Sequence, residues 1–149
     1  MTDIRFYHLT VQSLDQALPA ILTKALDAGH KILVKCPNEA SATRISDQLW
    51  TFRPDSFLPH GTKKDGHDAD QPIYLTAGND NPNTAGMLVL TGGAVAENMG
   101  DFALCCEMLD GHDGEAIAAA RERWKAYKDA GHDITYYQQT DTGGWDKKA

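Results

Sequence analysis

The sequence lacks a glycine-rich phosphate loop of either common kind. It contains no G-x-x-x-x-G-K-[ST] segment, and the turn after the first predicted strand, Thr10-Val11-Gln12-Ser13, has no glycine. Backbone amides can approach a phosphate closely only where glycines leave room for it. The absence argues against a nucleotide-binding enzyme, although that class remains the alternative to be weighed.

Basic residues are scarce and form no continuous run. The chain has 14 Lys and Arg against 21 Asp and Glu, a net charge of −7. Proteins bind DNA largely by displacing counterions from phosphates with Lys and Arg. We therefore expect no direct contact with DNA, including the single-stranded form, although a local basic patch can still bind an acidic peptide.

Long apolar runs are also missing, and cysteines are few. No stretch approaches the roughly 20 apolar residues that span a bilayer, and the first residues form no apolar signal region. The three cysteines, Cys36, Cys105 and Cys106, are odd in number, and two are adjacent in an apolar run. This pattern predicts a cytoplasmic protein, without membrane contact, whose thiols are reduced and buried.

Few residues suggest chemistry. His60 and His67 lie near several aspartates, but their spacing is irregular and favours a solvated loop over a metal site. Neither Ser56 nor Cys36 has a nearby base in a recognisable nucleophile elbow. The vicinal pair Cys105-Cys106 lies among apolar residues, which predicts buried rather than redox-active thiols. We expect no metal, no cofactor and no catalytic residue.

Strand and helix patterns alternate along the chain, which predicts an α/β fold with parallel pairing. Ser13 and Gln16 form a capping box, Gly29 ends that helix, and Pro19 either kinks it or marks a later start. We expect one domain over 1–149, with a flexible tail over 140–149 and a long connection over 51–71. The predicted strands are 4–9, 31–36, 72–76 and 87–91, with 102–109 a strand or a short helix end and 132–137 extended. The predicted helices are 13–28, 38–50 and 113–130.

The last predicted helix carries the most informative surface. Arg121, Trp124, Lys125 and Lys128 follow i, i+3, i+4, i+7 spacing and share one face. An indole beside a guanidinium fork suits an acidic peptide with an aromatic end and a free carboxylate. The alternative is an ordinary amphipathic helix with Trp124 in the core and its cations solvated.

Several segments, in order and at these spacings, resemble the chi subunit family of DNA polymerase III over nearly the whole chain. The matching segments are Phe6-Tyr7-His8-Leu9, Gln48-Leu49-Trp50-Thr51-Phe52, Ser56-Phe57-Leu58-Pro59-His60-Gly61, Asp70-Gln71-Pro72-Ile73, Asn81-Pro82-Asn83 and the run 120–128. The resemblance implies a three-layer, Rossmann-like fold with a mostly parallel central sheet flanked by helices. It also implies a non-catalytic subunit of a holoenzyme with DNA-directed DNA polymerase activity.

The resemblance further implies partners. In the family, chi links the clamp-loader complex to single-stranded DNA-binding protein by gripping its acidic C-terminal tail, which ends in phenylalanine. Arg121 and Trp124 occupy the family's tail-binding positions, and Lys125 and Lys128 are further candidates. A second surface, here Phe57, Leu58, Pro59 and His60, binds the psi subunit or a competing helicase-like protein. Ile117 stands where some members have a basic residue, and residues 143–149 match no part of the family pattern.

Overall fold

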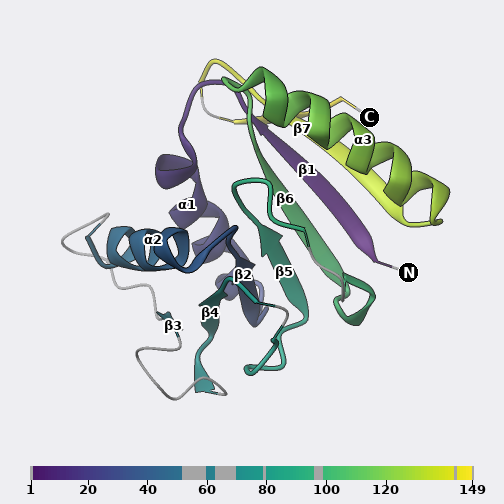
Figure 1. Cartoon of the computed structure of the whole chain (residues 1–149). Coiled ribbons are helices and arrows are strands. Elements are labelled where there is room, and N and C mark those ends of the chain that lie inside the picture. Colours follow the sequence, from purple (N-terminus) through teal and green to yellow (C-terminus); the bar gives the residue numbers. More distant parts are fainter. Residues whose placement is uncertain are drawn as a thin grey trace.

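The computed structural model describes residues 2–51, 60–62, 70–78, 80–95, 99–142 and 144–148, with Trp50, Thr51 and Met99 described by their backbone alone. These residues form three helices and eight strands. Strands and helices alternate from β1 to α2, and α3 lies between β6 and β7 (Figure 1). The helices are α1 (Leu14–Asp27), α2 (Glu39–Thr51) and α3 (Gly114–Asp129), and η3 (Met99–Asp101) is a 3₁₀ turn. The strands are β1 (Asp3–Leu9), β2 (Ile32–Lys35), β3 (Gly61–Thr62), β4 (Ile73–Thr76), β5 (Met87–Leu90), β6 (Leu104–Asp110), β7 (Asp133–Gln139) and β8 (Trp145–Lys147).

The strands form one sheet in the order β3-β4-β2-β5-β6-β1-β7-β8. Every neighbouring pair is parallel except β7 and β8, which form an antiparallel hairpin. The first strand, β1, lies between β6 and β7 and pairs with both. The predicted α/β class with a mostly parallel sheet is confirmed.

Two apolar cores lie on opposite faces of this sheet, because successive strand residues point to opposite sides. Along β2, Ile32 and Val34 belong to the core beneath α1 and α2, whereas Leu33 belongs to the core beneath α3. Strands covered on both faces are apolar throughout, and all four residues of β2 are buried. The result is three layers, with α1 and α2 on one face and α3 on the other.

Helix α1 begins at Leu14, as the capping box predicts, and continues through Pro19. Ser13 Oγ accepts from the Gln16 amide, and Gln16 Oε1 accepts from the Ser13 amide. A proline inside a helix cannot donate to the carbonyl four residues earlier, here that of Asp15. The Gln48 side chain of α2 donates to this carbonyl instead, at 3.2 Å.

The carboxyl end of the chain differs from expectation. Residues 140–149 are expected as a flexible tail, but Trp145–Lys147 form β8 and pair with β7. Strand β7 also extends beyond the predicted segment, to Gln139. The open choice for 102–109 is settled as a strand, β6, whose register with β1 begins at Leu104.

All three cysteines are free and buried, as predicted. Burial raises the pKa of the Cys106 thiol to about 12 and raises those of Cys36 and Cys105 as well. A thiol with a raised pKa is a poor nucleophile. In the part of the chain that the structure describes, no helix is both long and apolar enough to cross a bilayer.

Candidate functional site

Helix α3 is fixed at both ends and through its middle. The Asp113 side chain accepts from the amides of Glu115 and Ala116 at 3.0 and 3.3 Å, which caps the first turn. Gly131, with φ +88, follows the last turn in the left-handed conformation that glycine tolerates. Between the ends, Arg123 pairs with the buried carboxylate of Glu107 on β6.

Above this attachment, α3 and β7 enclose an open hollow of about 350 Å³. Arg121 and Trp124 both line it, together with Ile117, Ala120, Leu109 and Tyr136. We call this hollow the α3 pocket. The structure therefore brings the two principal predicted residues, Arg121 and Trp124, to one cavity.

Trp124 has two roles in this structure. Its ring packs on Phe6 of β1 at a centroid distance of 5.6 Å and edge-on to Tyr136 of β7 at 5.8 Å. It remains only partly buried and forms a wall of the α3 pocket. The sequence offered packing in the core and lining a binding pocket as alternatives for Trp124, and in the structure Trp124 does both.

Arg121 is exposed, and no described residue forms a hydrogen bond or ion pair with it. It nevertheless influences its neighbours. The pKa of His8 is lowered by burial and then by the charges of Arg121 and His112. Burial raises the pKa of Tyr136, and Arg121 opposes that rise. The Arg121 guanidinium thus lies at the pocket wall, and its N–H groups can donate hydrogen bonds to a ligand.

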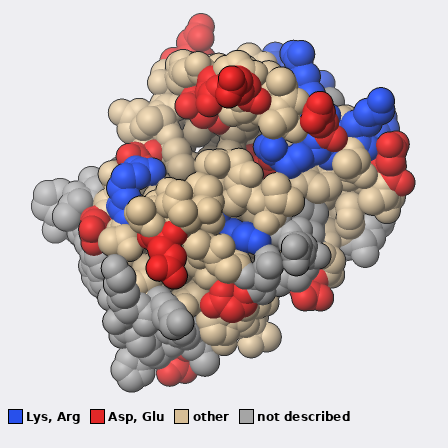
Figure 2. All heavy atoms as spheres, viewed as in Figure 1, with Lys and Arg blue, Asp and Glu red and all other residues tan. Residues whose placement is uncertain are grey.

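The remaining predicted residues fall elsewhere. Lys125 and Lys128 are exposed on α3 but do not line the α3 pocket. Lys125 follows Arg121 by four residues, so its charge lies one helical turn away. Figure 2 shows Lys and Arg side chains gathered over the α3 side of the molecule, among acidic ones.

The second predicted surface is only partly described. Phe57, Leu58 and Pro59 lie outside the described residues. His60 is buried, and its Nε2 lies 3.0 Å from the carbonyl oxygen of Ser46 on α2. Its ring therefore contacts α2 rather than solvent. Among the described residues no cluster of His, Cys, Asp or Glu suits a metal ion.

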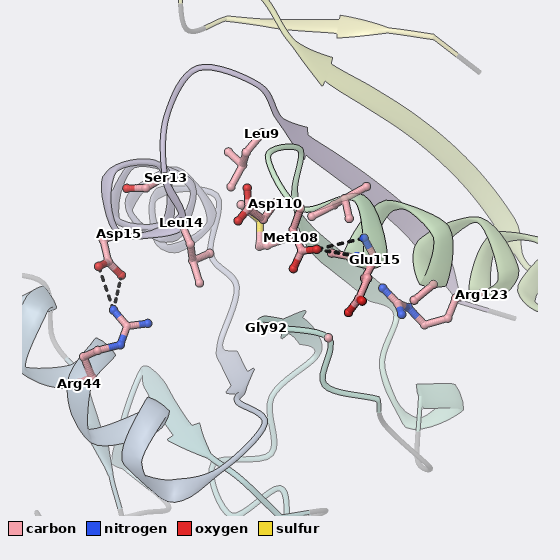
Figure 3. Close-up of a pocket in the computed structure, with 15 residues that line it drawn as sticks. Leu9, Ser13, Leu14, Asp15, Arg44, Gly92, Met108, Asp110, Glu115 and Arg123 are labelled. Carbon is pink, nitrogen blue, oxygen red and sulfur yellow. Dashed lines mark hydrogen bonds and ion pairs between the residues drawn. The ribbon is translucent and has the colours of Figure 1, made fainter.

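A second hollow, of about 580 Å³, lies at the carboxyl ends of β1, β5 and β6 (Figure 3). Ligands of open α/β sheets bind at such strand ends. Here the lining includes the carboxylates of Asp15, Asp110, Asp113 and Glu115. Its two arginines are already paired: Arg44 bonds to Asp15 at 2.8 Å, and Arg123 bonds to Glu107. A phosphate would therefore meet repulsion here, which weighs against the nucleotide-binding alternative.

The sequence predicted Arg121 and Trp124 but not Tyr136 or Leu109. A signal for Tyr136 was present, because alternation along an extended segment places residue 136 on the same face as 134 and 138. The sequence does not specify how β7 pairs with β1. It therefore could not show that the face carrying Tyr136 is the face that α3 covers. Leu109 reaches the pocket only because β6 lies on the other side of β1.

The fold and the surface together define a class of protein. It is a three-layer α/β domain with a mostly parallel sheet. Carboxylates line the carboxyl ends of β1, β5 and β6, and Arg121 and Trp124 lie on the surface of α3. Within that class, the chain belongs to the DNA polymerase III chi subunit family. The family model described as "DNA polymerase III chi subunit, HolC" matches residues 1–135. The chain is therefore a DNA replication protein, and residues 136–149 lie beyond the family match.

Individual relatives agree with this assignment. The chain is 24% identical over 139 residues to the DNA polymerase III subunit chi of Pseudomonas aeruginosa, covering 90% of this chain and 94% of that protein. It is 24% identical over 127 residues to the Escherichia coli protein of the same name, covering 83% and 84%. A "Probable DNA polymerase III subunit chi" of Rickettsia prowazekii is 30% identical over 90 residues, covering 60% of this chain and 54% of that protein.

Proposed function

We propose that this chain is a non-catalytic adaptor that links the DNA polymerase III clamp-loader complex to the acidic C-terminal tail of single-stranded DNA-binding protein. The observation that carries the proposal is an unpaired arginine, Arg121, on the rim of an apolar pocket walled by Trp124. A guanidinium fork matches a carboxylate in geometry and charge. The pocket beside it accepts the phenyl ring at the end of such a tail.

Charge distribution supports the same ligand. The chain carries a net charge of −7, yet Arg121, Lys125 and Lys128 place three positive charges along α3. An acidic peptide is attracted to this stretch and repelled by most of the remaining surface. We expect micromolar binding, about −8 kcal/mol, that weakens with added salt.

The test is a fluorescence anisotropy titration with a labelled acidic peptide that ends in phenylalanine with a free carboxylate. Arg121→Ala should weaken binding by about tenfold or more, because a charge-assisted contact contributes roughly 1.5–3 kcal/mol. Arg44→Ala is the matched control, since Arg44 is an exposed arginine on the opposite face. Equal affinities for wild type and Arg121→Ala would show that the acidic peptide does not bind at the α3 pocket.

A gain of affinity is expected from Ile117→Lys in the same titration. Ile117 lines the α3 pocket one turn before Arg121, where some family members carry a basic residue. A lysine there can keep its stem on the apolar wall and its ammonium in solvent. One added exposed charge should tighten binding by about two- to fivefold. Unchanged affinity would show that the peptide does not pass this turn of α3.

A separate part of the proposal concerns the segment Phe57, Leu58, Pro59 and His60. On the strength of the resemblance, we propose this segment as the docking surface for the psi subunit or for a competing helicase-like protein. Capture of purified psi on the immobilised chain tests it: Phe57→Ala should lose psi and retain the acidic peptide, and Arg121→Ala should do the reverse. Retention of psi by Phe57→Ala would assign psi to another surface.

A further inference from the structure

A third hollow, of about 340 Å³, opens on the face of the sheet opposite α3. One side is helix α1, through Ile21, Lys24 and Ala28, and the other is formed by β1, β7 and β8. We call it the hairpin pocket, because the β7–β8 hairpin supplies Tyr137 and Trp145. It shares no lining residue with the α3 pocket.

Three aromatic rings form one wall of the hairpin pocket. Tyr7 stacks on Tyr137 with centroids 5.3 Å apart and an interplanar angle of 11°, and Trp145 meets Tyr7 edge-on at 5.1 Å. All three rings are only partly buried. The floor beneath them is apolar, formed by Ala25, Met87, Leu104 and Cys106. Such a cavity favours a bulky apolar side chain that needs no hydrogen bonds.

The rim of the hairpin pocket is basic. Arg5, Lys24 and His30 line it, and no acidic residue does. Arg5 shares its charge with Asp3 at 3.2 Å, whereas Lys24 is exposed and has no partner among the described residues. In a chain of net charge −7, the exposed ammonium of Lys24 beside a lining that has no acidic residue favours an anionic ligand.

We propose that the hairpin pocket is a second docking site, which takes an acidic peptide segment of a partner protein with one bulky apolar side chain. Single-stranded nucleic acid fits less well. A base on the apolar floor would leave its polar edge without partners, and the rim offers too few cations to follow a phosphate backbone. The inference goes beyond the proposed function and uses different residues.

The site depends on a part of the chain that the family model does not match. Tyr137 and Trp145 both lie after residue 135, where that match ends. Without β8, the aromatic wall would lose the ring that closes it over Tyr7. Two rings of the aromatic wall therefore come from residues beyond the family match, while the rest of the lining comes from residues within it.

The indole N–H signals of the three tryptophans, Trp50, Trp124 and Trp145, allow a site-specific test. The uniformly ¹⁵N-labelled chain is titrated with the acetylated and amidated peptide Glu-Asp-Phe-Glu-Asp, after assignment with single Trp→Phe variants. The Trp145 signal should shift saturably. Lys24→Glu should weaken that response by about five- to tenfold, because it reverses an exposed charge at the rim.

Arg121→Ala is the matched control, since it alters the α3 pocket and leaves the hairpin pocket intact. It should retain the full Trp145 response, so failure of the proposed function is distinguishable from failure of this inference. Lys24 is exposed, and an unchanged amide spectrum verifies that Lys24→Glu folds. A Trp145 signal that does not move overturns the proposal. So does a signal that oligothymidylate moves at lower concentrations than the peptide.

Discussion

Arg121 and Arg123 are two residues apart on α3, yet their surroundings differ completely. Arg123 points toward the sheet and neutralises Glu107, a carboxylate with a relative side-chain exposure of 2%. Arg121 lines the α3 pocket without a partner. The sequence singled out Arg121 through helical spacing with Trp124. It could not reveal the role of Arg123, because Glu107 belongs to an apolar strand where a charged side chain is unexpected.

The pKa of His8 depends on the charge in the α3 pocket. Its Nδ1 lies 2.5 Å from the Tyr136 hydroxyl oxygen, and its pKa is lowered by burial and by Arg121 and His112. Arg121→Ala should raise the His8 pKa toward its ordinary value, because one repelling charge is removed. An acidic peptide in the pocket should raise it too, so peptide binding should strengthen as the pH falls through the His8 titration.

The measurement is an NMR titration of the His8 ring protons with and without the peptide. A His8 pKa that does not respond to either Arg121→Ala or the peptide would place the bound peptide away from Tyr136.

At the scale of elements, side chains from neighbouring elements compensate for local defects. Pro19 removes one hydrogen bond from α1, and Gln48 of α2 satisfies the carbonyl left free. The sequence predicted the start and end of α1 through Ser13 and Gly29, since caps are local features. It left the effect of Pro19 open, because the compensating residue lies on another helix.

The attachment of α3 to β6 predicts a pH-dependent loss of stability in Arg123→Met. Removing one partner of a buried ion pair leaves a buried charge and costs about 3 kcal/mol near neutral pH. Burial already raises the pKa of Glu107 above its ordinary 4.5, against the opposing effect of Arg123. Without Arg123, the folded state binds this proton still more tightly than the unfolded state, so the variant should lose stability as the pH rises above about 4.5.

Urea unfolding of Arg123→Met and wild type at pH 5 and pH 8 measures this effect. The loss should be smaller at pH 5, where Glu107 is more readily protonated. The double variant Arg123→Met with Glu107→Gln is the control, since it has no carboxyl group to titrate and should show no such difference. An equal loss at both pH values would mean that Glu107 remains ionised or solvated without its partner.

For the whole molecule, the alternation of strands and helices was sufficient to predict the layered, mostly parallel sheet. The order of strands within that sheet was not predictable. Strand β1 pairs with β6 and β7, two strands distant in sequence, and such pairings leave no local pattern. Strand β8 was missed for a related reason: Trp145 alone in a polar segment gives no strand signal, and its packing on Tyr7 becomes visible only in three dimensions.

The central position of β1 affects how the chain folds during synthesis. Ile4 and Phe6 leave the ribosome long before their neighbours in the sheet, which are residues 104–110 and 133–139. Both edges of an apolar strand therefore stay open through most of translation, a situation that favours aggregation or chaperone binding. Nascent chains that end before β6 cannot complete the sheet, so productive folding waits until β6 and β7 have been synthesised.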